Sequence, residues 1–234
     1  MLRALIFDFD GVIVDSEPLI MNLTCQMAAR EGWIVTEEDY YRDYLALDDR
    51  GIVEHLFRTH GRPIDAVRHD ELVRWKEEAY FQAIRDGLPP MPGAVNFVRL
   101  AAARFALAIA SGSLRREVAY LLGKLGLFDE FPVLATADEC ERSKPDPCSY
   151  LTALRGLQAL NCFHGAPLRA IECLAIEDAP AGIEAAHAAG MKCLAVSHSR
   201  PAAELSRAEW VAASFLNVDL FAIAEDYGRD DGNT

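Results

Sequence analysis

Two aspartates separated by one residue, Asp8 and Asp10, follow directly after a short apolar run. On an extended backbone, residues i and i+2 project to the same side, so we expect both carboxylates on one face at the end of a strand. Two like charges this close favour a bound cation, and Mg2+ takes oxygen ligands that often include one or two carboxylates. The alternative is a solvated acidic turn, and the apolar residues that lead into Asp8 make it the weaker interpretation.

Polar segments follow two further apolar runs. Ser111, Gly112 and Ser113 precede a helical pattern, and hydroxyl and backbone N–H groups at a helix start can bind a phosphate oxygen. Taken alone, N-capping of that helix by Ser113 is the favoured interpretation. Lys144 stands before Pro145, which disfavours helix at the lysine and holds it in an extended loop. It is either a fixed cation near the site or an exposed lysine in a turn.

Glu177 and Asp178 end another apolar run and lead into a helical pattern. Acidic residues at that place also complement a helix dipole, which is the competing interpretation. Together, however, the successive strand ends provide acids, a hydroxyl, a lysine and acids again. This set supplies a carboxylate nucleophile, a carboxylate for proton transfer, phosphate ligands and metal ligands, which is what phosphoryl transfer through an aspartyl phosphate requires.

Five apolar runs bounded by polar or turn residues are typical of strands that are buried on both faces. They are Ala4 to Phe7, Ala106 to Ala110, Val133 to Ala135, Cys173 to Ile176 and Lys192 to Val196. Helical patterns lie between them at Ala94 to Ala103, Arg115 to Leu125, Pro147 to Leu160 and Ala181 to Ala189. This alternation predicts a doubly wound α/β fold with a parallel sheet, in which ligands bind beyond the carboxyl ends of the strands.

The interval from Glu17 to about Gly87 lacks strand-like runs and carries only helical patterns. Because it follows the first strand, we expect a small helical cap over the crevice, with a return hinge at Asp86 to Pro90. The expected domains are a core of residues 1–16 and 88–228 and a cap of residues 17–87. The polar residues from Glu225 to Thr234 are expected to be poorly ordered and to leave a tail at residues 229–234.

The 234 residues contain 23 Lys and Arg against 36 Asp and Glu, a formal net charge of −13. An acidic surface repels a phosphate backbone, so nucleic acid is not expected as a partner, and an anionic substrate must meet local positive charge. The six cysteines are scattered without a C-x-x-C pair, which argues against a zinc site and favours a reducing cytosol. No apolar stretch approaches the ~20 residues that span a bilayer, and no signal-peptide cleavage site follows Leu2 to Val14. We expect a cytoplasmic monomer with no membrane partner.

At these motifs the chain resembles the haloacid dehalogenase-like (HAD) hydrolase superfamily, within the group that contains β-phosphoglucomutases and small-metabolite phosphatases. The four motifs stand at Asp8 to Glu17, Ile109 to Gly112, Lys144 to Pro145 and Ile176 to Gly182. The resemblance covers nearly the whole chain, and it implies a Rossmann-like core with a small helical cap inserted after the first strand.

The resemblance also implies roles for individual residues. Asp8 would be the nucleophile and Asp10 the acid and base, while Ser111 and Lys144 would contact phosphoryl oxygens. The implied ligands of Mg2+ are Asp8, the Asp10 carbonyl, Asp178 and, directly or through water, Glu177. The further substrate contacts would come from Ser16, Arg50, Lys76, Gly112 and Ser113. For the two cap cations among them, a solvated charge on a helix is an equal alternative.

The second aspartate of the first motif favours phosphate esters, because the dehalogenases of the family lack it and an ester oxygen needs a proton to leave. Lys76 keeps open a relationship to the group that cleaves phosphonoacetaldehyde with a cap lysine, but the second-motif sequence of that group is absent. Against a mutase, Ile20 stands where the mutases have a histidine, and Leu45 to Arg50 departs from their cap loop.

The leading hypothesis is therefore a Mg2+-dependent phosphatase, a phosphoric monoester hydrolase that acts on a small phosphorylated metabolite through an aspartyl phosphate. A sugar or polyol phosphate is the expected substrate. The first alternative is a β-phosphoglucomutase-type phosphomutase, which would pass the phosphoryl group to a second hydroxyl instead of to water. The second alternative is a non-catalytic protein of the same fold that only holds a metal.

Overall fold

The computed structural model describes residues 1–45, 47–160, 163, 166–198 and 200–229. The chain divides into two compact units. We call the unit built from Met1–Asp15 and Pro89–Thr234 the core unit, and the unit built from Ser16–Leu88 the helical unit. The chain thus leaves the core unit within the first sequence motif, directly after Asp15.

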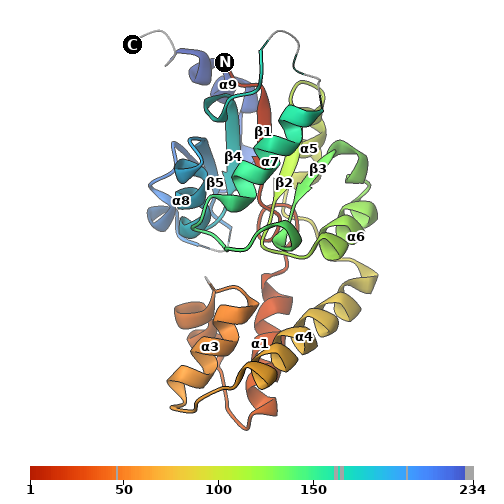
Figure 1. The fold of residues 1–234 in the computed structure, drawn as a ribbon. Helices are drawn as coiled ribbons and strands as arrows, with labels where there is room; N and C mark the ends of the chain where they lie inside the picture. Colours follow the sequence, from red (N-terminus) through yellow and green to blue (C-terminus); the bar gives the residue numbers. More distant parts are fainter. Residues whose placement is uncertain (46, 161–162, 164–165, 199, 230–234) are drawn as a thin grey trace. The chain divides into compact units, whose positions relative to one another are not determined.

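The core unit contains six parallel strands in the spatial order β3-β2-β1-β4-β5-β6 (Figure 1). Their bounds are β1 Ala4–Phe7, β2 Ala106–Ala110, β3 Val133–Ala135, β4 Cys173–Glu177, β5 Lys192–Val196 and β6 Trp210–Ala212. In the register of the sheet, Phe7 at the end of β1 pairs with Ile109 of β2 and Ile176 of β4. The residues that follow these three strands therefore emerge at the same edge of the sheet.

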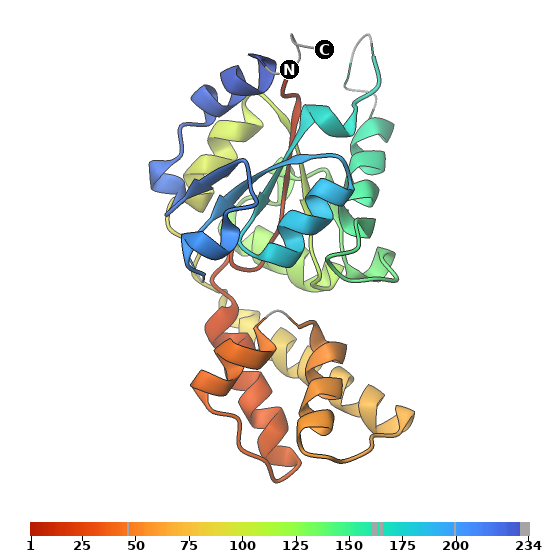
Figure 2. The ribbon, with the colours of Figure 1, turned by 90° about the vertical axis from the view of Figure 1, so that its left-hand side faces the viewer.

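Helices cover both faces of the sheet, and Figures 1 and 2 show α7 and α8 on one side and α5 and α9 on the other. The helices of the core unit are α5 Ala94–Ala102, α6 Arg115–Leu125, α7 Cys148–Ala159, α8 Pro180–Ala188 and α9 Leu220–Arg229, with 3-10 turns η3 Phe128–Glu130, η4 Ala137–Glu139, η5 Ala170–Glu172, η6 Ala202–Leu205 and η7 Phe215–Asn217. Successive strand residues face opposite layers. Ile6 joins a buried cluster with Tyr150 and Ile183, whereas the Phe7 ring packs edge-on against Phe97, with centroids 6.1 Å apart. The strands are apolar throughout because both faces are covered.

The helical unit has a buried core of its own. Its helices are α1 Glu17–Arg30, α2 Glu37–Asp39, α3 Asp49–Thr59 and α4 Ala66–Ala83, with a π-helical turn η1 Tyr40–Tyr44 and a 3-10 turn η2 Ile84–Asp86. Met27 of α1, Leu56 of α3 and Leu72 of α4 belong to this core. The carboxylates of Asp48 and Asp65 begin α3 and α4 by accepting hydrogen bonds from backbone N–H groups, at 2.7 and 2.8 Å.

The predicted fold class is confirmed: the sheet is parallel, and helices stand between its first two strands. The five expected strands are present, and β4 extends through Glu177. The sequence pattern does not predict β6, because three residues flanked by polar ones carry little periodic signal. Among the helices of the described residues, none is long and apolar enough to cross a membrane.

The expectation of poor order from Glu225 onward is wrong for residues 225–229, because α9 continues to Arg229. Tyr227 explains the difference. Its hydroxyl donates a hydrogen bond to the Cys173 carbonyl at 2.5 Å, and its ring stacks on that of Trp210 with centroids 5.9 Å apart. Residues 230–234 of the expected tail lie outside the described residues.

Candidate active site

Three carboxylates meet at the carboxyl ends of two neighbouring strands. Asp8 follows β1, while Glu177 and Asp178 lie at the end of β4, which pairs with β1. The Asp8 N–H continues the ladder by donating to the Ile176 carbonyl at 2.9 Å. Each of the three carboxylates offers an oxygen, and these oxygens lie within 4.8 Å of one another. The sheet topology thus brings together acidic residues that are far apart in the sequence.

Lys144 lies against this acidic cluster. Its Nζ atom is 2.9 Å from Asp8 Oδ1 and 2.7 Å from Glu177 Oε1, and only 15% of its side chain is exposed. Burial alone would lower the pKa of Lys144, but the charges of Asp8 and Glu177 outweigh burial and raise this pKa above its ordinary value. The alternative of an exposed lysine in a turn is therefore wrong, and Lys144 is a fixed cation at the strand ends.

Glu177 is fully buried and hydrogen-bonded at both carboxylate oxygens. In addition to Lys144, the Tyr150 hydroxyl donates to Oε1 at 2.7 Å, and the Asp178 N–H donates to Oε2 at 3.2 Å. Burial raises the pKa of Glu177, and the Lys144 charge opposes this rise. The sequence analysis does not identify Tyr150, because nothing near it in the sequence indicates a hydrogen bond to a strand end.

Two glycines lack the side chain that would otherwise fill the space occupied by the Asp178 and Glu177 carboxylates. Gly11 has a φ of +71°, and a Cβ atom there would lie 2.2 Å from Asp178 Oδ2. Gly182, in the first turn of α8, would place a Cβ atom 2.0 Å from Glu177 Oε1. A side chain at either position would collide with an acidic group of the cluster. Both glycines lie within the sequence motifs, but only the tertiary contacts reveal their function.

Asp10 has a different neighbour from Asp8. The Ser113 hydroxyl donates a hydrogen bond to Asp10 Oδ2 at 2.5 Å. The expected N-capping of the next helix by Ser113 is wrong, because α6 begins at Arg115 and its N-cap residue is Leu114. Ser113 instead fixes the second carboxylate of the first motif.

Ser111 and Gly112 form the turn that leads to Ser113. Ser111 is almost fully buried; its N–H donates to the Ala135 carbonyl at 2.9 Å, and its hydroxyl oxygen accepts the Ser113 N–H at 2.9 Å. A hydroxyl that accepts such a bond still carries its own proton to donate. Gly112 is exposed, with open space where a Cβ would stand. Both residues lie directly beyond the end of β2, next to β1.

The helical unit holds the three other residues expected to contact substrate. Ser16 is fully buried, and its hydroxyl has no hydrogen-bond partner among the described residues. Arg50 is exposed in the first turn of α3. Lys76 of α4 is only 3% exposed and forms an ion pair with Asp49. The interpretation of Lys76 as a solvated charge on a helix is therefore wrong. Arg50, in contrast, is exposed to solvent, as that interpretation expects.

The acidic cluster fits a metal ion by its donor chemistry. Lys144 contributes one positive charge to a cluster of three carboxylates, those of Asp8, Glu177 and Asp178. Buried like charges are costly unless a cation or hydrogen bonds compensate them. Carboxylate oxygens are also the ligands that hard divalent cations prefer. The cluster can therefore hold a metal, as the sequence motifs predict.

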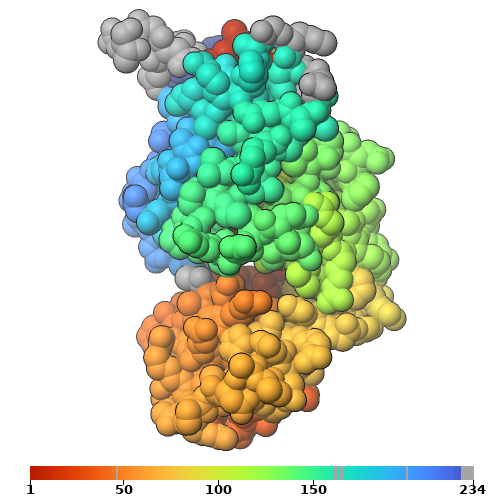
Figure 3. Space-filling model, in the orientation of Figure 1, coloured from red at the N-terminus to blue at the C-terminus, as the bar shows by residue number. Residues whose placement is uncertain are grey.

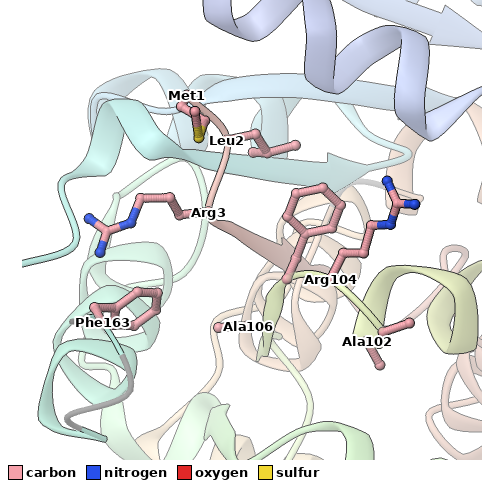
Figure 4. A pocket seen from close by; sticks show the side chains of 9 residues that line it. Met1, Leu2, Arg3, Ala102, Arg104, Ala106 and Phe163 are labelled. Atoms are coloured by element: carbon pink, nitrogen blue, oxygen red, sulfur yellow. The ribbon is translucent and has the colours of Figure 1, made fainter.

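A hollow of about 550 Å3 lies elsewhere on the core unit (Figure 4). It is lined by residues that include Arg3, Arg104 and Phe163. Ala106, which begins β2, also lines it, so the hollow lies at the amino ends of the strands. The acidic cluster stands at the opposite ends, and the hollow is not part of that site.

Several similar proteins match this chain over most of its length. Protein CbbY of Rhodobacter capsulatus is 33% identical over 219 residues, which cover 89% of this chain and 92% of that protein. The phosphorylated carbohydrates phosphatase of Thermotoga maritima is 29% identical over 191 residues, covering 82% and 83% of the two chains. Among solved structures, β-phosphoglucomutase of Clostridium difficile superposes with a TM-score of 0.85 over 99% of both chains; at 22% identity, this likeness shows the fold alone.

The family comparison covers the residues that build the acidic cluster. Residues 2–190 match the haloacid dehalogenase-like hydrolase family. This stretch includes Asp8, Lys144 and the end of β4, so the observed cluster lies wholly inside the matched region. The motifs that suggested a resemblance in the sequence are thus part of a match over most of the chain. The chain belongs to the haloacid dehalogenase-like hydrolase family.

Proposed function

We propose that this hydrolase is a Mg2+-dependent phosphatase that removes phosphate from a small phosphorylated metabolite, a sugar or polyol phosphate. The observation that carries the proposal is the position of the Lys144 ammonium between Asp8 and Glu177, two members of the cluster that also contains Asp178. A carboxylate cannot readily approach a phosphate dianion unless positive charge offsets the repulsion between them. The cluster combines a carboxylate, a fixed cation and oxygen ligands for a metal.

In the proposed reaction, an Asp8 carboxylate oxygen attacks phosphorus in line with the ester oxygen, and the bond from phosphorus to that oxygen breaks. Asp10 donates a proton to the departing oxygen, leaving an aspartyl phosphate on Asp8. Asp10 then takes a proton from the water that attacks the aspartyl phosphate, which releases inorganic phosphate and restores both carboxyl groups. The hydrogen bond from Ser113 to Asp10 orients this acid and base.

Asp8, Asp178 and the Asp10 carbonyl are the proposed ligands of Mg2+. Both oxygens of Glu177 already accept hydrogen bonds from protein groups, so we propose that Glu177 acts through a water molecule or by positioning its neighbours. When bound, Mg2+ supplies positive charge that stabilises the transferring phosphoryl group. Lys144 and the Ser111 hydroxyl supply the remaining contacts to phosphoryl oxygens.

Two observations support the substrate class. The Thermotoga maritima relative is a phosphatase of phosphorylated carbohydrates. The helical unit also presents the exposed cation Arg50, and the chain as a whole carries a net charge of −13, so local cations are needed to attract an anionic ester. We propose that Arg50 contributes to the choice of ester and not to the chemical step.

Phosphate release from a panel of sugar, polyol and aryl phosphates tests the proposal. We expect release with Mg2+, loss of release with EDTA, recovery when excess Mg2+ is added, and no release by Asp8→Asn. Absence of metal-dependent release from every ester would contradict the proposal. The panel includes β-glucose 1-phosphate with a bisphosphate activator, and glucose 6-phosphate forming faster than inorganic phosphate would establish a mutase instead.

A further inference from the structure

Two cysteines bracket the segment that carries Lys144. Cys140 follows η4 directly, and Cys148 is the first residue of α7, with Lys144 midway between them. Figure 3 shows the green segment that precedes α7 at the surface of the core unit. Cys140 and Cys148 are each partly exposed, so a small oxidant in solvent can reach both.

The Cys140 side chain lies against the start of α7, the helix that Cys148 begins. Burial and the neighbouring Cys148 together raise the pKa of Cys140 to about 12. The Cys140 sulfur also lies 4.0 Å from the Thr152 hydroxyl. Thr152 stands one helical turn after Cys148, so both side chains lie on one face of α7. Cys140 therefore packs across the first turn of that helix.

Other hydrogen bonds hold the segment in a compact turn. The Asp146 N–H donates to the Ser143 carbonyl at 3.1 Å, and the Asp146 carboxylate accepts the Cys148 N–H at 3.0 Å. These bonds link the centre of the segment to its Cys148 end, and the contact of Cys140 with Thr152 places the other end against α7. Because Lys144 lies midway between the two cysteines in this short turn, we expect a displacement of Cys140 or Cys148 to move Lys144 as well.

We propose that Cys140 and Cys148 form a reversible disulfide that closes the segment into a ring around Lys144 and lowers the hydrolytic activity. With hydrogen peroxide as oxidant, the sulfur–sulfur bond forms, the oxygen–oxygen bond of the peroxide breaks, and the two thiol protons leave in two water molecules. A dithiol reductant reverses the step by thiol–disulfide exchange. In a reducing compartment the pair rests as thiols, and the disulfide forms only under oxidation.

The loss of activity rests on the proposed function of Lys144. A disulfide holds its two sulfurs about 2.0 Å apart, which is closer than two unbonded thiols can approach, so its formation draws the two ends of the segment together. Lys144 contacts Asp8 at 2.9 Å and Glu177 at 2.7 Å, and a displacement of about 1 Å at a reacting group can cost up to ~100-fold in rate. We expect a loss of at least about tenfold in kcat/KM.

The sequence provides a direct readout of the disulfide. Trypsin cleaves after the exposed Arg142, which lies between the two cysteines, and not between Lys144 and Pro145. Cys140 and Cys148 therefore fall on separate tryptic peptides, residues 125–142 and 143–155. In the oxidised protein these two peptides remain joined, and mass spectrometry detects them as one species that reductant separates.

The experiment treats the full chain with hydrogen peroxide and follows both the joined peptides and hydrolysis of p-nitrophenyl phosphate. The wild type is expected to form the joined species, to lose activity and to recover both with dithiothreitol. Cys140→Ser and Cys148→Ser are expected to retain activity under the same treatment. Cys25→Ser is the matched control, because Cys25 lies in the helical unit, where it donates to the Val35 carbonyl; it should respond as the wild type does.

Two results would overturn the proposal. The first is that the two peptides separate without reductant after oxidation, because the disulfide would then not form. The second is that the joined species accumulates while activity stays unchanged. Failure of the proposed phosphatase function is distinguishable from both, because the reduced enzyme would then be inactive on every ester while the joined peptides would still report the disulfide.

Discussion

The two aspartates of the first motif lie two residues apart, yet they have different partners. Asp8 contacts the Lys144 ammonium, and Asp10 accepts a hydrogen bond from the neutral Ser113 hydroxyl. A carboxylate beside a fixed cation can approach a phosphate, and a carboxylate that accepts a hydrogen bond from a hydroxyl is held in a fixed orientation. This difference in environment supports the proposed division into a nucleophile and an acid and base.

Substitution of each aspartate should separate these functions. Asp8→Ala removes the attacking oxygen and a proposed metal ligand, so hydrolysis of p-nitrophenyl phosphate is expected to fall below detection. Asp10→Ala removes proton transfer but retains the backbone carbonyl, so activity is expected to fall about 10²- to 10⁴-fold. Calorimetric titration with Mg2+ should show weakened binding only for Asp8→Ala. Equal weakening in both variants would contradict the division.

His198, which is not a member of the acidic cluster, offers a pH-dependent measurement of stability. Burial lowers the pKa of His198 below its usual 6.5, although the Asp15 carboxylate opposes this shift. As the pH falls through 6.5, the unfolded chain takes up a proton before the folded protein does. The unfolded state then binds more protons, so His198 makes the free energy of unfolding fall as the pH decreases.

Urea unfolding of the wild type and of His198→Gln between pH 7.5 and 5 checks this sign. The wild type is expected to lose more stability than the variant over this range, because only the wild type carries the depressed imidazole pKa. Ionic strength is held constant so that other charges contribute equally to both proteins. Parallel curves for the two proteins would show that burial of His198 does not perturb its titration.

At the scale of the elements, the carboxyl ends of β1, β2 and β4 hold the proposed acids and hydroxyl groups of the core unit. The start of α8 must pass close to the end of β4, and Gly182 permits this approach to the Glu177 carboxylate. The segment before α7 supplies Lys144, while Tyr150 within α7 holds the same Glu177 oxygen. The site therefore depends on how closely these elements pack.

Gly182→Ala is expected to disturb the site and to lower stability. A Cβ atom 2.0 Å from Glu177 Oε1 must displace the buried carboxylate and its bond to Lys144, so we expect a loss of about 1–3 kcal/mol in the free energy of unfolding and a loss of activity. Gly123→Ala in α6 is the matched control, because its Cβ atom meets open space. It is expected to stabilise the helix by about 0.5–1 kcal/mol. Urea unfolding and kcat/KM compare the two, and unchanged values for Gly182→Ala would exclude the collision.

At the scale of the whole molecule, the chain builds two units with separate buried cores, joined by two connecting segments. Next to one connection, the Asp15 N–H donates to the Pro89 carbonyl at 2.9 Å, so the ends of both segments are held together within the core unit. All the core-motif side chains proposed for the chemistry belong to this unit. The helical unit contributes exposed charged residues such as Arg50. Substitution of such a residue is not expected to alter the acidic cluster.

Arg50→Ala should therefore change which ester is accepted and spare the chemical step. For a sugar phosphate that the wild type hydrolyses, we expect kcat/KM to fall about tenfold or more, the order lost with a charged hydrogen bond. Hydrolysis of p-nitrophenyl phosphate should stay within about twofold. Arg74→Ala removes the same charge from an exposed position on α4 and should leave both activities unchanged. A loss of generic hydrolysis in Arg50→Ala as complete as in Asp8→Ala would refute this assignment.

The sequence alone determined the α/β class and five of the strands, because strands covered on both faces must be apolar throughout and are bounded by polar turns. It also placed Asp8, Ser111 and Glu177 at the ends of strands, since each follows an apolar run directly. Such information is local, as each signal lies within a few residues of the position that it predicts. The helical insertion followed from the same reasoning, because its pattern changes from strand runs to helical spacing.

Only the tertiary structure decided which partner each of these side chains has. Ser113 turns to Asp10 instead of capping a helix, Lys76 is buried against Asp49, and Tyr150 reaches Glu177. Each of these contacts joins residues that are distant in the sequence, and it forms because packing of apolar faces brings their elements together. Contacts of this kind leave no periodic pattern in the sequence. A hydrogen bond depends on the distance and direction between two groups, and only the folded structure determines these.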